Sequence, residues 1–573
     1  MTIARQCRIA TQQSNGQTIT TGYDKLGRQV SYNDGTGNTA TTEYDLLDRQ
    51  VKVSDSAPST KTVTYDTAKD PRGLATSLTD SVAGTFTATY GTDGELLTEH
   101  LPGGYTLALE SDNVGQETSV VYTRDSDGMI LLADAGDYSV HGRLVHHTGT
   151  AGETTDQAYT YDKPGRLLRT DDTGADGTCT RRAYAFDDNS NRTSLTSSTS
   201  EPGTGCADST TTTSNTYDSA DRLIATGTSY DAFGRTISQA NGAAIDYYAN
   251  DLVRRQTVGT QRQTWDVDAA GRLASWTTET QGADQTWNQT AHKVNHYGSN
   301  GDSPDWIAED ANGTISRTVR GLTGSLEAAT SASGSTVLQL TNIHGDLGVQ
   351  LPLDTTKAPV VLRQDEFGNP LGSGGSTTRY GWLGGLQRSS ETTTGAILMG
   401  VRLYDPVSGR FLSTDALPGG NANAYDYAYD YAYDYAFGDP INRVDFDGRS
   451  SYWKTRYYSW GRLTYHTWSF WDWSGYHVGA SIYAYFNRYW TGQIAAHLNT
   501  WWDRVGAVLA LLAGMTKNFY VMAAAAFFWL YGYWVQDVAN YAYKHHQCLR
   551  VKAADGFKGY YAYTYMYPSH VHC

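Results

Sequence analysis

The block of residues 400–448 begins Gly400-Val401-Arg402-Leu403-Tyr404-Asp405-Pro406-Val407-Ser408-Gly409-Arg410-Phe411 and ends Asp445-Phe446-Asp447-Gly448. Before this block the chain is acidic and rich in Gly, Thr and Ser; after it the chain is basic and rich in Trp and Tyr. Residues 449–573 hold 11 Lys and Arg and 4 Asp, a net charge of +7, so the total of −16 leaves −23 for residues 1–448. The contrast predicts either that the acidic and basic parts attract each other or that only the basic tail meets an anionic partner.

A short motif repeats along the acidic part. Tyr23-Asp24-Lys25-Leu26-Gly27-Arg28 returns as Tyr44-Asp45-Leu46-Leu47-Asp48-Arg49. Tyr favours a strand, Asp accepts turn N–H groups, and Gly supplies the left-handed residue before the returning strand. One such hairpin cannot bury its own face, so the copies should stack into a continuous antiparallel sheet. Further copies stand at Tyr65-Asp66, Tyr161–Arg166, Phe186-Asp187, Tyr217–Arg222, Tyr230–Arg235, Asp268–Arg272 and Asp365–Asn369.

The repeats and the block together resemble the RHS proteins, also called YD-repeat proteins. The resemblance implies part of a spiral β-shell followed by a variable C-terminal cargo, often a toxin. We therefore expect a mainly β fold with an N-terminal end at 1–16, a repeat shell at 17–399 and an RHS repeat-associated core at 400–448. A smaller, mainly α tail with a terminal β-hairpin should follow at 449–573.

Shells of this family often cut themselves with two aspartates that share a proton. Asp415 matches the second aspartate, whereas Glu391 stands where the family has the first. The cleavage motif is also altered, reading Asp445-Phe446-Asp447-Gly448-Arg449. An extra methylene displaces the carboxylate by up to about 1.5 Å, and errors near 1 Å cost roughly a hundredfold in rate. We expect aspartyl self-cleavage to be weak or absent, and no cofactor or metal.

The chain has five cysteines without the C-x-x-C spacing of a zinc site. Cys179 and Cys206 flank one polar stretch, and Cys548 and Cys573 flank a predicted hairpin. Two disulfides and one spare thiol are therefore expected outside the cytosol, and five buried free thiols are the alternative. Residues 1–10 lack the apolar core of a signal peptide. We expect a secreted or cell-surface protein that leaves by another route, or the C-terminal part of a longer one.

The tail carries apolar residues at helical spacing over 478–512, and no charged residue from Phe519 to Val535. Seventeen residues rise about 26 Å as a helix, near the thickness of a bilayer core. A membrane-active segment and a soluble helical core are both consistent with this pattern. A hairpin should follow, with strands at 549–552 and 559–567 and a turn at 554–556. The histidines at 545–546 and 570–572 leave a nuclease as another possibility, although the tail has no Glu.

The function expected from these features is a shell that encloses or presents a polymorphic effector for competition between bacteria. The resemblance implies a cognate immunity protein as partner, and the remainder of the shell if the chain is a fragment. An anionic membrane fits the basic tail, and nucleic acid is a less suitable partner. The alternative is a cell-surface structural or adhesion protein, because rows of Tyr and Asp can also bind carbohydrate.

Overall fold

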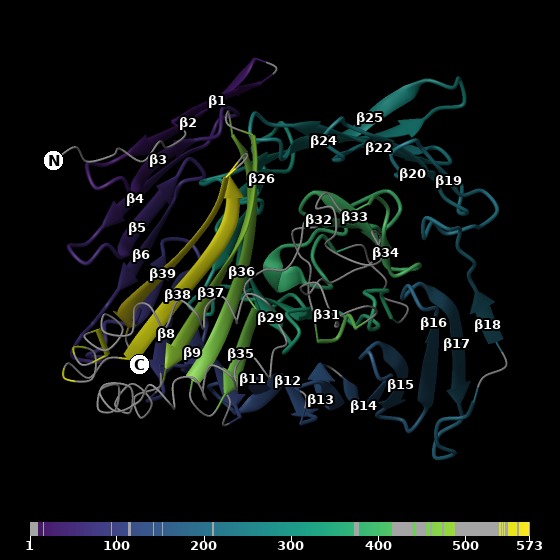
Figure 1. Ribbon diagram of the computed structural model, residues 1–573, viewed down its shortest axis with the longest axis horizontal. Helices are drawn as coiled ribbons and strands as arrows, with labels where there is room; N and C mark the ends of the chain where they lie inside the picture. Colours follow the sequence, from purple (N-terminus) through teal and green to yellow (C-terminus); the bar gives the residue numbers. More distant parts are fainter. Residues whose placement is uncertain are drawn as a thin grey trace. The chain divides into compact units, whose positions relative to one another are not determined.

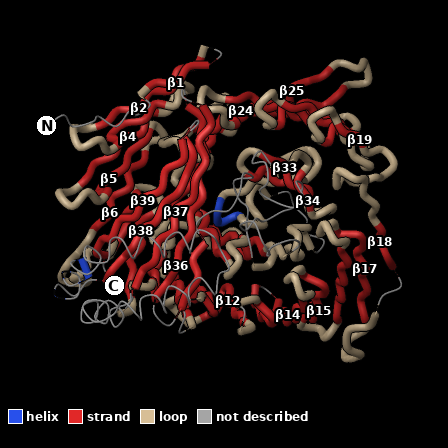
Figure 2. Tube along the Cα trace, in the orientation of Figure 1, coloured by secondary structure: helices blue, strands red, loops and turns tan. Residues whose placement is uncertain are grey.

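The structure is a computed structural model, and the regular secondary structure of its described residues is almost entirely antiparallel β-strand (Figures 1 and 2). It describes residues 10–371, 378–414 and 439–442, except 15, 93, 113–115, 141, 152 and 209–210. In the tail it describes 454–458, 461–472, 475–486, 548–558, 561–571 and residues 538, 539, 541 and 544. The chain forms two compact units, one of residues 1–89, 96–110 and 118–450 and one of 90–95, 111–117 and 451–573.

The first sheet of the larger unit has eighteen strands. Each strand pairs antiparallel with the next one in the chain from β1 to β8, between β9 and β10, and from β11 to β18. The strands are β1 Thr11–Ser14, β2 Gln17–Tyr23, β3 Gln29–Asn33, β4 Thr39–Tyr44, β5 Gln50–Asp55, β6 Ser59–Thr64, β7 Ser77–Asp80, β8 Gly84–Tyr90, β9 Leu96–Leu101, β10 Tyr105–Ser111, β11 Glu117–Arg124, β12 Met129–Tyr138, β13 Leu144–Ala151, β14 Glu153–Tyr161, β15 Leu167–Gly174, β16 Cys179–Phe186, β17 Arg192–Ser200 and β18 Thr211–Ser214.

The second sheet has thirteen strands in the same sequential order. They are β19 Ser229–Tyr230, β20 Thr236–Ser238, β21 Ala244–Tyr247, β22 Val253–Val258, β23 Gln261–Val267, β24 Leu273–Gln281, β25 Trp287–His296, β26 Trp306–Ala308, β27 Ile315–Arg320, β28 Leu326–Ser331, β29 Thr336–Thr341, β30 Leu347–Pro352 and β31 Val360–Val361. A 3-10 turn, η1 Gly384–Leu386, precedes a small sheet of β32 Ile397–Met399, β33 Arg402–Asp405 and β34 Arg410–Phe411. The predicted mainly β fold is confirmed.

The repeated motif forms the turn that its sequence predicts. Asp24 Oδ1 accepts the backbone N–H groups of Leu26 and Arg28, each at 2.9 Å. Gly27 has a φ of 79°, and Asp48 takes the same left-handed conformation in the next copy, with a φ of 64°. Aspartate tolerates this conformation better than most residues because its short side chain bonds locally.

The arginine of the motif has a role that the sequence did not reveal. Arg28 Nε lies 2.7 Å from Asp24 Oδ2, and Arg28 Nη1 reaches Asp48 Oδ1 of the next copy at 2.6 Å. The Arg28 guanidinium also covers the ring of Tyr44, whose hydroxyl donates to the Gln29 carbonyl at 2.9 Å. Arg28 therefore closes its own turn and ties it to the next copy. The same Asp–Arg pair recurs in Asp45–Arg49, Asp162–Arg166, Asp218–Arg222, Asp231–Arg235 and Asp268–Arg272.

The largest hydrophobic core lies where the two large sheets meet. The first sheet contributes side chains from β7 to β12 and the second sheet contributes side chains from β27 to β30. They include Phe86, Leu107, Val120, Tyr122 and Leu132 on one side and Val319, Ala328, Leu338, Leu340 and Val349 on the other. Burial of these apolar faces against each other holds the two sheets together.

The smaller unit contains a five-stranded antiparallel sheet: β35 Lys454–Tyr458, β36 Gly461–Asp472, β37 Gly475–Phe486, β38 Cys548–Lys558 and β39 Tyr561–Val571. The terminal hairpin is confirmed, but β38 runs through the predicted turn at 554–556 and ends at Lys558. The helix predicted to begin at Val478 is wrong there, because β37 pairs with strands on both of its edges. Tertiary pairing outweighs the local helical spacing in this segment.

Candidate functional site: the core segment and its anchors

Residues 378–414, named here the core segment, lie between strands of the two large sheets (Figure 1). Ala396, Leu403 and Leu412 pack with Trp265 and Trp276 of the second sheet. Thr236 N donates to the Leu412 carbonyl at 2.8 Å, which adds a backbone contact beside β20. The core segment is therefore held from one side by the second sheet.

Arg410 attaches the core segment to the first sheet. Its Nη1 donates to Asn191 Oδ1 at 2.6 Å, and its Nη2 donates to the Asp221 carbonyl at 2.6 Å. The guanidinium also lies 4.8 Å from the centre of the Tyr217 ring. Asn191 stands four residues after Asp187, where most copies of the motif have arginine. Its shorter amide still donates to Asp187 Oδ2 at 2.9 Å, and it leaves room for a guanidinium from elsewhere in the chain.

The other copy with asparagine at this position also receives the core segment. Asn369 stands four residues after Asp365, and its Nδ2 donates both to Asp365 Oδ2 at 2.8 Å and to the Pro406 carbonyl at 3.0 Å. Burial and the neighbouring Glu366 raise the pKa of Asp365 to about 6. Glu366 itself is held by Arg182, with Nη2 and Oε1 2.7 Å apart. The two motif copies with asparagine are thus both contact points for residues 406–410.

Glu391 lies in a cluster of alternating charges. Its Oε2 is 2.6 Å from Arg379 Nε, and its Oε1 is paired with Lys293 Nζ. Both cations also pair with Glu309, whose pKa they hold below its usual value despite its burial. Both oxygens of Glu391 therefore contact cations, which is a structural role and differs from a carboxyl that shares a proton with an aspartate. Asp415 lies outside the described residues.

Residues 439–442 form a second anchor, just before the predicted cleavage region. Asn442 Oδ1 accepts the Leu144 N–H at 2.8 Å, and Asn442 Nδ2 donates to Asp439 Oδ1 at 2.7 Å and to Tyr161 Oη at 3.1 Å. Ile441 packs into the hydrophobic cluster that contains Tyr161 and Leu144. Asp439 is almost fully buried. The first sheet therefore fixes the chain at 439–442.

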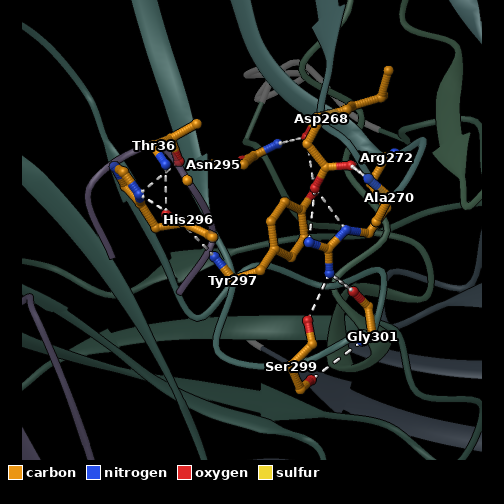
Figure 3. A network of polar contacts seen from close by, with 12 residues as sticks. Thr36, Asp268, Ala270, Arg272, Asn295, His296, Tyr297, Ser299 and Gly301 are labelled. Atoms are coloured by element: carbon orange, nitrogen blue, oxygen red, sulfur yellow. Dashed lines mark hydrogen bonds and ion pairs between the residues drawn. The ribbon is translucent and has the colours of Figure 1, made fainter. Parts of the chain in front are cut away.

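A polar seam joins the first strands of the larger unit to β24 and β25 (Figure 3). His296 Nδ1 bonds Asp34 Oδ2 at 2.8 Å, and the His296 ring stacks on Trp306. Arg272 donates to the carbonyls of Ser299 and Gly301, each at 2.7 Å. Thr36 and Asp34 both approach the same nitrogen of His296, so this group is a structural junction and lacks the geometry of a catalytic triad.

The other predicted site residues have different outcomes. Cys179 and Cys206 form a disulfide with their Cα atoms 5.1 Å apart, as expected. Cys548 begins β38. The structure does not describe Cys573, the cleavage residues Asp445, Gly448 and Arg449, or the segment from Phe519 to Val535. Among the residues that are described, no cluster of His, Cys, Asp and Glu could hold a metal, and no helix is long and apolar enough to cross a membrane.

The sequence pointed to Glu391 but missed the residues that define these contacts. Lys293 and Arg379 carry no motif, and the structure alone brings them to Glu391. Asn191 and Asn369 did carry a signal, since they break the Asp-to-Arg pattern of the repeat. A motif copy that keeps its aspartate but has asparagine in place of arginine was the sequence feature that could have indicated where the core segment binds.

The sheets, the repeated turns and the inserted core segment together form a mainly antiparallel β fold that solved toxin-complex structures share. The crystal structure of TcdB2-TccC3 shares this fold, with a TM-score of 0.60 and 16% sequence identity over 76% of this chain and 24% of that one. TcdB2-TccC3 without its hypervariable C-terminal region gives a TM-score of 0.60 at 16% identity, covering 75% of this chain and 24% of that one. The Tc holotoxin pore of Photorhabdus luminescens with the TccC3-D651A mutation gives 0.52 at 16% identity, covering 75% and 21%.

This chain thus spans about a quarter of the length of the TcdB2-TccC3 chains that it matches. At 16% identity the likeness is one of fold. No protein-family model and no curated protein sequence matches the chain.

Proposed function

We propose that residues 17–448 are part of a shell that carries residues 449–573 as a C-terminal effector. The observation that carries this proposal is the anchor at 439–442, where Asn442 and Ile441 attach to the first sheet directly before the compositional change. A carrier needs such a fixed point, because it sets where the effector chain starts. The fold shared with TcdB2-TccC3, a protein described with a hypervariable C-terminal region, supports the same reading.

The more specific parts of the proposal concern the biological role of the effector and its partner proteins. We infer that the effector serves competition between bacteria and is neutralised in the producer by an immunity protein. Because the structures that share this fold are multi-component toxin assemblies, further shell or toxin components are also expected partners. Export to the cell surface or the medium follows from this role, and the Cys179–Cys206 disulfide is compatible with it.

Expression of residues 449–573 alone in bacteria tests the carrier proposal. Growth should stop on induction, whereas expression of residues 1–448 should leave growth unchanged. The competing proposal, a surface adhesin with an inert tail, requires unaffected growth together with retention of the 1–448 fragment on a carbohydrate matrix. Unaffected growth would contradict an effector role.

The mode of action that we favour is membrane damage. A net charge of +7 draws the tail to anionic lipid, at about 1 kcal/mol per basic residue near the surface. The uncharged stretch from Phe519 to Val535 would then insert. The 449–573 fragment should depolarise anionic vesicles, and Ala525→Arg should prevent this at a cost of about 2.5–3.5 kcal/mol of insertion. Ala525→Leu is the matched control and should stay active. Intact vesicles with degraded DNA or RNA would instead favour a nuclease-tipped toxin.

A further inference from the structure

Two buried glutamates from different sheets meet inside the largest core. Glu99 belongs to β9 of the first sheet and Glu327 belongs to β28 of the second sheet. Their exposed fractions are 0% and 3%. They lie among the strands whose apolar side chains join the two sheets, and the two carboxyl groups accept hydrogen bonds from the N–H groups of two successive residues, Leu322 and Thr323.

In each carboxyl group, only one of the two oxygens accepts hydrogen bonds from another residue in the described part of the chain. Glu99 Oε1 accepts the Leu322 N–H at 2.9 Å, and Glu327 Oε1 accepts the N–H of Thr323 at 3.3 Å and its hydroxyl. The remaining oxygen of each group, Oε2, is buried without a donor in the described part of the chain. A buried acceptor without a donor costs about 1–3 kcal/mol. A proton on one carboxyl group would make that group a donor as well as an acceptor.

No cation neutralises the pair among the described residues. The titratable group that faces it from β11 is Tyr122, which burial keeps neutral by raising its pKa. Arg320, at the end of β27, is turned to Gln387, with Nη2 and Oε1 2.7 Å apart. Burial raises the pKa of both glutamates, and the charge of Glu99 raises that of Glu327 further. Two ionised carboxylates here would repel each other in a medium of low dielectric.

We propose that Glu99 and Glu327 share a proton across the junction of the two sheets, and that loss of this proton weakens the junction as the pH rises. The pair contributes its full stability below the ordinary glutamate pKa of about 4.3. The contribution falls as the pH rises through the raised pKa of the folded state, because the unfolded chain has by then lost a proton that the folded chain keeps. The device is independent of the effector proposal and concerns the larger unit alone.

Thermal unfolding of the full chain from about pH 5 to about pH 9, across the range set by these pKa shifts, tests the device. Glu327→Gln replaces one carboxyl group of the pair with an amide, which stays neutral and can donate a hydrogen bond at every pH. Its unfolding temperature minus that of the wild type should become more positive as the pH rises, and Glu99→Gln should do the same from the opposite sheet. Glu279→Gln, which breaks an ion pair with Arg262, is the control and should lack this trend. A difference that stays constant with pH for both pair variants overturns the proposal.

A second measurement does not depend on the stability of the variants. The infrared spectrum of the wild type at neutral pH should contain the carbonyl band of a protonated carboxyl group. This band should be weaker in the spectrum of Glu327→Gln. Absence of any such band in the wild type contradicts a shared proton. A fall in unfolding temperature on adding a chelator would show that a bound cation holds the pair, which also overturns the proposal.

Discussion

At the scale of single residues, the repeat turns differ mainly in the side chain four positions after the aspartate. Beside Arg235, hydrogen bonds from the arginine hold the pKa of Asp231 below its usual value despite partial burial. With asparagine there, and with Glu366 beside it, the pKa of the buried Asp365 rises from 3.8 to about 6. The same turn geometry therefore accompanies pKa shifts of opposite direction at its aspartate.

This difference predicts opposite pH effects from two matched substitutions. Asp365 contributes stability below its unfolded pKa of 3.8, and this is lost as the pH rises to about 6. Asp365→Asn should therefore remove a decline in the free energy of unfolding between these pH values. Asp231→Asn should instead remove stability that is present above the unfolded pKa and lost as the pH falls. Urea unfolding from well below pH 3.8 up to about pH 6 measures both, and identical slopes for the two variants would contradict the argument.

Burial predicts which repeat arginine matters most. Arg272 pairs with Asp268 at exposed fractions of 10% and 3%, so Arg272→Met leaves a carboxylate buried without its cation. Loss of one partner from a buried pair costs about 3–5 kcal/mol. Arg28→Met is the matched control and should cost much less, because the Arg28 side chain has an exposed fraction of 25%. Equal urea midpoints for the two variants would show that burial does not set the cost.

At the scale of elements, the core segment binds where the repeat is interrupted. The sequence predicted the strands, the turns and the interrupted copies, because the motif acts through bonds between residues two to four positions apart. It could not predict that Arg410 fills the place beside Asn191, since the two lie 219 positions apart. The helix expected from Val478 failed for a related reason, because pairing with distant strands decided the structure of β37.

A double-mutant cycle tests the match between Arg410 and Asn191. Arg410→Met should destabilise the larger unit by about 1.5–3 kcal/mol, the usual contribution of a hydrogen bond to a charged group. Asn191→Arg should also destabilise it, because two guanidinium groups would compete for one place. Combining the two substitutions should recover part of the loss. Strict additivity in urea unfolding would contradict the match. Arg124→Met, in an exposed pair with Asp127, should have little effect.

At the scale of the whole molecule, self-cleavage would require residues from distant parts of the chain to meet. The ion pairs of Glu391 with Lys293 and Arg379 oppose this. We predict that the purified chain has its full mass of 62.7 kDa by mass spectrometry. Glu391→Asp should raise any cleaved fraction, and adding Asp415→Asn should abolish it. A wild-type chain that is already divided near Gly448 would show this prediction to be wrong.

The sequence by itself determined the stacked β-hairpins, because each turn depends on Asp, Gly and Arg within six consecutive residues. It also indicated the Cys179–Cys206 pair and the charge contrast between the two parts. Only the tertiary structure decided which acids lie without a cation in the described part of the chain, as do Glu99 and Glu327, and which are paired with one, as is Glu391. These outcomes depend on the packing of two sheets and an inserted segment, and burial and charge partners there come from residues that no local pattern connects.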